Sequence, residues 1–133
     1  MTLQTYLFFP GNCEEAIGFY RKVFGAELVF LMRFKEGPAE LNTPGSEEKV
    51  FHATLRFGET KLNMADVPST DNGAFGGFAL LTHFDTVEEG ERVFQELAKG
   101  GGVSLPFEPT FWAARYGIVT DAFGLTWKIQ VDR

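Results

Sequence analysis

The sequence is poor in cysteine and histidine. Its 133 residues include one cysteine, Cys13, and two histidines, His52 and His83. A single thiol excludes an intrachain disulfide and agrees with a reducing compartment, so we interpret the protein as cytoplasmic. The two histidines form neither an HxH nor an HExxH motif, so the sequence has no local metal-binding motif.

Basic residues are in the minority. Twelve Lys and Arg against eighteen Asp and Glu give a formal net charge of −6. A general nucleic-acid binder needs a basic face that replaces the counterions of the phosphates, so we expect no nucleic-acid partner. The acidic balance is compatible with a cationic ligand, but keeping the protein in solution explains it as well.

Long apolar runs are absent as well. No stretch approaches the roughly 18 apolar residues that a membrane-spanning helix needs. The first residues lack the basic segment of a signal peptide, and Pro10 and Gly11 interrupt the apolar stretch that follows. We therefore expect no membrane association and no targeting segment.

Phenylalanine, in contrast, is abundant. The chain has 15 Phe, 2 Trp and 3 Tyr, which together make 15% of its residues. Aromatic rings fill protein cores, and they also line pockets that hold apolar or planar ligands. Most of these rings must pack in the core, and the others are expected to line a pocket.

Two segments carry the start and stop signals of a helix. The first begins at Asn12 and ends at Gly25, and the second begins at Thr86 and ends at Gly100. In each, a Glu follows the first residue at the third position, and apolar residues recur at helical spacing. The Asn and Thr side chains are expected to cap the free amides of the first turn.

Strand-like stretches surround the two helices in the same order, one before each helix and three after it. They are residues 6–9, 27–34, 50–57 and 60–65 around the first helix, and 78–81, 103–107, 116–120 and 125–131 around the second. This repeat predicts an α+β fold of two tandem βαβββ modules.

We expect one domain over residues 1–133. The first module takes residues 1–66, a linker 67–77, and the second module 78–133. Residues 35–49 are rich in Gly, Pro and Glu. They either border the mouth of a pocket or form a tolerated surface insertion.

Three stretches resemble a known family when taken in order. They are LFFPGNCEEAIGFY at 7–20, VFHATLRFG at 50–58, and FWAARYG at 111–117, which continues to DAFGLTW at 121–127. The chain resembles the vicinal oxygen chelate superfamily of glyoxalase I, bleomycin-resistance proteins and extradiol dioxygenases, and within it the PhnB-like branch. The resemblance implies an incomplete barrel, or cup, for a small molecule and usually a homodimer.

The resemblance also implies where a metal would bind. Enzymes of the superfamily hold a divalent metal with His, Gln or Glu from the first and last strand of each module. The corresponding positions are Thr5, Asn63, Phe78 or Ala79, and Lys128. None is a histidine or a carboxylate, and a lysine repels a cation. We therefore expect no family-type metal and no other cofactor; a site that combines His52 with a distant Glu is the alternative.

His52 is the candidate catalytic residue. A neutral imidazole in a strand can act as a general base near neutral pH, or it can be a core histidine bonded to the backbone. Trp112, Arg115 and Tyr116 are candidate ligand contacts, since Arg clamps carboxylates and Trp stacks on rings. Their alternative role is structural.

The remaining candidate contacts are residues expected to line the cup, together with His52. They are Phe8, Phe30, Met32, Phe57, Asn63 and Lys128. Lys128 suits an anionic ligand. Two functions stay open: a metal-independent binding protein, and a lyase, isomerase or dioxygenase that uses a displaced metal or His52. A regulatory partner protein is a third interpretation.

Overall fold

A computed structural model of the chain describes residues 1–67 and 75–133. The predicted linker, 67–77, lies for the most part outside the described residues. The chain divides into two compact units, Met1–Gly73 and Ala74–Arg133, and each is described by itself. No helix among the described residues is long and apolar enough to cross a membrane.

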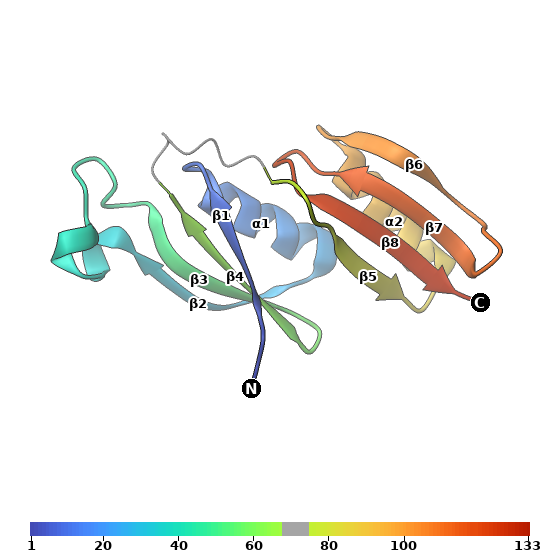
Figure 1. Cartoon of the computed structure of the whole chain (residues 1–133), viewed down its shortest axis with the longest axis horizontal. Helices are drawn as coiled ribbons and strands as arrows, with labels where there is room; N and C mark the ends of the chain where they lie inside the picture. Colours follow the sequence, from blue (N-terminus) through green and yellow to red (C-terminus); the bar gives the residue numbers. More distant parts are fainter. Residues whose placement is uncertain (68–74) are drawn as a thin grey trace. The chain divides into compact units, whose positions relative to one another are not determined.

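Unit 1 is a four-stranded mixed sheet with one helix on one face (Figure 1). Its elements are β1 (Thr5–Phe9), α1 (Cys13–Phe24), β2 (Glu27–Arg33), β3 (Val50–Phe57) and β4 (Thr60–Asp66), with short 3-10 turns at Phe34–Glu36 and Ala39–Leu41. The strand order is β1-β4-β3-β2, in which only the β1–β4 pair is parallel.

Unit 2 repeats this topology. Its elements are β5 (Leu80–Phe84), α2 (Val87–Ala98), β6 (Gly102–Glu108), β7 (Ala113–Thr120) and β8 (Thr126–Asp132). The strand order is β5-β8-β7-β6, again with a parallel pair between the first two strands. The predicted pair of βαβββ modules is therefore confirmed. Within residues 1–67 and 75–133 each sheet has two edge strands, so neither sheet closes into a barrel by itself.

Side chains alternate between two faces in each sheet. In unit 1, the face toward α1 carries the buried residues Leu7, Ala53 and Met64, which are paired in register. The opposite face, called the open face here, carries Tyr6 and Asn63, which are also paired. The register therefore separates an apolar core from a face with polar groups.

The start of α1 differs from the prediction. Asn12 makes no side-chain capping bond. The backbone amide of Cys13 instead donates to Asp66 Oδ1 at 2.9 Å, and the amide of Val50 donates to Oδ2 of the same carboxylate at 2.9 Å. The reason is tertiary: β4 runs parallel to β1 and ends beside it, which brings a buried carboxylate to the helix start.

The start of α2 follows the prediction. The Thr86 hydroxyl accepts a hydrogen bond from the amide of Glu89 at 3.2 Å. The turn between β7 and β8 is held by Asp121, which is buried and accepts from the indole nitrogen of Trp127 at 2.9 Å. The strand before α2 is β5 at residues 80–84, two residues later than predicted.

Asp66 and Asn12 are the two candidate caps of α1, and substitutions of these two residues are expected to affect stability differently. We expect Asp66→Asn to lower the free energy of unfolding by about 1–3 kcal/mol, because one buried amide loses its acceptor. Asn12→Ala is not expected to lower it, since no capping bond is lost. Equilibrium unfolding in urea, followed by circular dichroism, measures both. A cost for Asn12→Ala equal to that of Asp66→Asn would contradict this account.

Candidate ligand-binding site

A pocket opens at one end of the unit 1 sheet, where β1 and β4 end and β3 begins. Its volume is about 1130 Å³. The lining residues are Tyr6, Phe8, Pro10, Gly11, Asn12, Phe34, Glu40, Leu41, Thr43, Gly45, Ser46, Lys49, Phe51, His52, Ala65, Asp66 and Val67. Among the residues that the structure describes, all of those that line the pocket belong to unit 1.

Residues 34–49 form one wall of the pocket. This segment contributes Phe34, Leu41 and Lys49, among others, so it borders a pocket as the first of the two interpretations of residues 35–49 expected. The ring of Phe34 meets that of Phe51 edge to face, with centroids 5.4 Å apart. The Lys49 ammonium donates to the carbonyl of Gly11 at 2.8 Å, which ties the end of the segment to the start of α1.

Arg33 holds the same segment at its other end. Its guanidinium makes two bonds with the carboxylate of Glu14, at 2.8 and 2.9 Å, and a third with the carbonyl of Glu48 at 2.7 Å. The bond from Arg33 lowers the pKa of the Glu14 carboxyl, so the pair is charged at neutral pH. These contacts connect α1 to the wall of the pocket.

A row of polar side chains crosses the open face beside the pocket. The Tyr6 hydroxyl lies 2.7 Å from His52 Nδ1, and His52 Nε2 lies 3.4 Å from the hydroxyl of Thr54. Thr54 bonds to Asn63 Oδ1 at 2.8 Å, and Asn63 Nδ2 donates to Gln4 Oε1 at 2.8 Å. Thr54 and Asn63 are buried, so their hydrogen bonds replace water.

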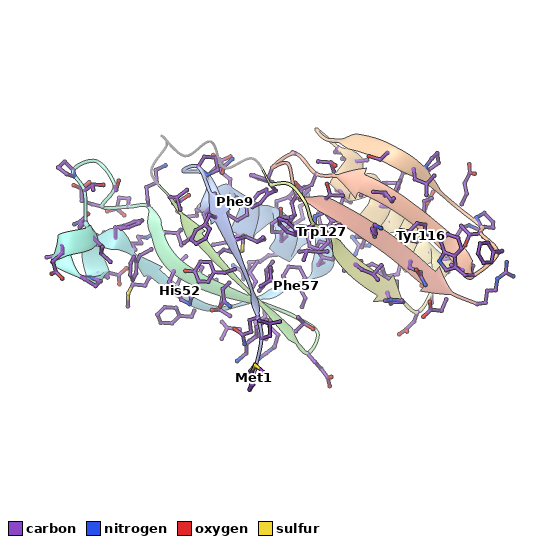
Figure 2. All side chains as sticks on the ribbon, in the orientation of Figure 1. Met1, Phe9, His52, Phe57, Tyr116 and Trp127 are labelled. Atoms are coloured by element: carbon purple, nitrogen blue, oxygen red, sulfur yellow. The ribbon has the colours of Figure 1, made fainter. Side chains whose placement is uncertain are left out.

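Tyr6 keeps its proton. Burial raises the pKa of the Tyr6 phenol above its ordinary value, and the nearby Cys13 raises it further. At neutral pH the side chain is therefore a hydroxyl that can both donate and accept. Figure 2 shows its partner, His52, on β3.

Five of the predicted contacts share the open face of unit 1. They are Phe8, Phe30, Met32, His52 and Asn63. Only Phe8 and His52 also line the pocket. Phe57 is separate, because its ring packs against Phe24 of α1 with centroids 5.2 Å apart.

The other predicted contacts lie in unit 2. Trp112 meets Tyr116 edge to face at 5.1 Å, and Tyr116 is paired with Gln130. Arg115 donates to the carbonyl of its neighbour, Ala114, at 2.8 Å. Lys128 is paired with Leu81 and Ile118. Trp112 and Tyr116 are thus in contact, as their proximity in sequence suggested.

Most of the residues that line the pocket were not among the sequence-predicted contacts; Tyr6, Asn12 and Lys49 are three of them. Strand alternation could have found Tyr6, because it lies two residues before Phe8 and therefore on the same face. Lys49 lies at the end of residues 35–49, for which a pocket border was one of the two interpretations. The sequence carries no comparable signal for Asn12, whose position indicates a helix cap.

Two of the positions at which the resemblance puts a family-type metal do not lie in a strand pair on the open face. Thr5 pairs with Leu62, on the α1 side of the sheet, and Phe78 and Ala79 precede β5. The equivalent paired positions on the first and last strands are Tyr6 with Asn63 in unit 1, and Leu81 with Lys128 in unit 2.

These four side chains are a phenol, an amide, an alkyl group and an ammonium. Zinc and other divalent metals prefer imidazole, thiolate or carboxylate ligands, so this donor set does not fit a family-type metal. Within residues 1–67 and 75–133, no three His, Cys, Asp or Glu side chains gather closely enough to hold an ion.

Comparison with known proteins identifies the class. The model of the Glyoxalase/Bleomycin resistance protein/Dioxygenase superfamily matches residues 2–129, and the chain belongs to this superfamily. Protein YjdN of Escherichia coli is 36% identical over 140 residues, which cover 98% of this chain and 95% of YjdN.

Solved structures narrow the class to the PhnB-like branch. Protein PA1353 from Pseudomonas aeruginosa has a TM-score of 0.88 and 34% identity, with 98% of each chain covered. The PhnB protein from Bacillus cereus has a TM-score of 0.85 and 28% identity, with 98% of this chain and 99% of that protein covered.

The contacts of Arg33 predict that its removal releases the pocket wall. We expect Arg33→Met to speed cleavage after Glu36 and Glu40 by endoproteinase Glu-C roughly fivefold, equivalent to about 1 kcal/mol of lost local stability. Cleavage rates are read by mass spectrometry. Arg56→Met is the matched control, because Arg56 pairs with Glu27 away from the segment. Equal rates for the two variants would contradict the role of Arg33.

Proposed function

We propose that the protein binds a small organic ligand in the pocket of unit 1, without the metal of its enzyme relatives. The observation that carries this proposal is the pocket itself, which apolar and polar residues of unit 1 line. A volume of about 1130 Å³ accommodates a molecule of drug-like size. Sequestration of such a molecule, in the manner of the bleomycin-resistance proteins of the superfamily, is one use of this binding.

The aromatic residues that line the pocket favour a planar ligand. The rings of Phe8, Phe34 and Phe51 offer flat apolar surfaces, and Phe8 is 52% exposed without a ligand. An exposed ring beside a cavity gains contact area when a planar molecule enters. Tyr6 and His52 add polar groups that orient the ligand.

A second candidate function is catalysis on a ligand in the same pocket. It is favoured by the hydrogen bond between Tyr6 and His52, because a phenol and an imidazole 2.7 Å apart form an acid–base pair. This candidate is a lyase, isomerase or dioxygenase that uses His52 as base or a metal at a displaced site. The metal content of the protein distinguishes the metal-dependent form of this candidate from the first proposal.

The binding proposal predicts a difference between two exposed phenylalanines of one sheet face. Phe8 lines the pocket, whereas Phe30, 45% exposed, does not. We expect Phe8→Ala to weaken binding of 8-anilinonaphthalene-1-sulfonate about tenfold by loss of ring contact, and Phe30→Ala to leave it within about twofold. Fluorescence titration measures both dissociation constants.

Elemental analysis of the same samples tests metal independence. The proposal expects far less than one divalent ion per chain, and equal probe binding before and after treatment with a chelator. One tightly held ion per chain would favour the metal-dependent enzyme. Equal effects of Phe8→Ala and Phe30→Ala would place the probe outside the pocket.

We also propose that the protein is a homodimer in the cytoplasm. The PhnB-like resemblance supports the dimer, as do free sheet edges and exposed apolar side chains in both units, such as Val29, Phe30, Leu81 and Leu105. The single cysteine is what supports a reducing compartment. Sedimentation equilibrium should give twice the mass of one chain; a single-chain mass at micromolar concentration would reject the dimer.

A further inference from the structure

The hydrogen bonds that connect Tyr6 to Asn63 across the open face each have a donor and an acceptor, and the Thr5 carbonyl beside Asn63 fixes which is which. The carbonyl oxygen of Thr5 can only accept, and it lies 3.5 Å from Asn63 Nδ2. The amide nitrogen of Asn63 therefore faces Thr5, and its oxygen faces Thr54. The Thr54 hydroxyl must then donate its proton to Asn63 Oδ1, at 2.8 Å.

The tautomer of His52 follows from the direction of the bond between Thr54 and Asn63. Because the one proton of Thr54 is used toward Asn63, Thr54 offers His52 Nε2 only a lone pair. The proton of the neutral imidazole therefore lies on Nε2, and Nδ1 is an acceptor. The Tyr6 hydroxyl consequently donates to Nδ1, across 2.7 Å.

This direction decides what Tyr6 presents to the pocket. Its single proton points to His52, so the lone pairs of its oxygen remain for a ligand. Tyr6 lines the pocket and is 41% exposed, so a bound molecule can reach this oxygen. The side chain therefore acts as an acceptor, although a tyrosine taken alone can play either role.

Asn12 provides a second, independent hydrogen-bond acceptor at the same pocket. Its Oδ1 atom is buried and has no hydrogen-bond partner among the described residues, and Asn12 lines the same pocket. A buried carbonyl oxygen without a donor is unfavourable, and a ligand that donates a hydrogen bond to it removes this penalty. Asp66 has taken the capping role, so helix formation does not explain the place of this side chain.

We infer that the pocket selects planar, mainly apolar molecules that carry an N–H or O–H donor, and that Tyr6 recognises this donor through its oxygen. Phenols, aromatic amines and amides belong to this class. His52, Thr54 and Asn63 are positioning residues, because they act on the ligand through Tyr6. The inference deepens the proposed binding function and rests on it.

A matched pair of probes tests the inference. 2-Naphthol and 2-methoxynaphthalene share one ring system, but only the first has an O–H donor. We expect the native protein to bind 2-naphthol about tenfold more tightly, as one hydrogen bond of about 1.4 kcal/mol implies. Tyr6→Phe should reduce this preference about fivefold or more. Any effect of methyl size on binding is common to both proteins and cancels in the comparison.

Tyr116→Phe is the matched control, because Tyr116 lies in unit 2 and does not line this pocket. It should keep the tenfold preference. If both probes bind equally well to the native protein, or if Tyr6→Phe keeps the full preference, the inference is wrong and the binding proposal stands. If neither probe binds, both are overturned.

The tautomer of His52 can be observed directly. Long-range proton–nitrogen NMR spectra at neutral pH should show the His52 proton on Nε2, with His52→Gln used to assign the signals. Thr54→Val should shift the tautomer toward Nδ1–H and reduce the preference for 2-naphthol, while circular dichroism stays unchanged. A native His52 with its proton on Nδ1 would reverse the direction of the Tyr6 bond and overturn the inference.

Discussion

The buried carboxylate of Asp66 joins the start of α1 to the start of β3, and the pocket forms at this junction. Its two oxygens accept hydrogen bonds from the backbone amides of Cys13 and Val50, so one side chain satisfies both donors. The chain neighbours of these amides, Asn12 and Phe51, line the pocket. This carboxylate therefore holds the start of α1 and the start of β3 together beside the pocket. Burial, and after it the nearby Asp66 carboxylate, raises the pKa of the Cys13 thiol, which stays neutral and unreactive at neutral pH.

The two units share a topology but differ in the chemistry of equivalent positions. Tyr6 and Asn63 are a paired phenol and amide in unit 1, while the equivalent pair in unit 2 is Leu81 and Lys128. A duplicated fold can therefore conserve its packing while each copy changes its outward side chains. Packing depends on the buried side of each strand, and period-two alternation leaves the other side free to vary.

The sequence predicted the element order well, because helix caps, glycine stops and apolar periodicity are local signals. Thr86 caps α2 as its spacing to Glu89 indicated. Asn12 carries the same signal and does not cap α1, since a carboxylate from β4 occupies that role. A competitor that lies 53 residues away along the chain leaves no mark on the local pattern.

In the candidate site, too, the sequence determined some features and the tertiary structure decided the others. The amino-acid sequence alone determined the two βαβββ modules and the family resemblance. It also predicted Phe8 and His52 as ligand contacts. Tertiary structure decided that Tyr6 rather than Thr5 lies on the open face, because a register shift of one residue exchanges the two faces of a strand. It also decided the direction of the bond between Tyr6 and His52, because this direction follows from Thr5, Asn63 and Thr54 on neighbouring strands, which only folding brings together.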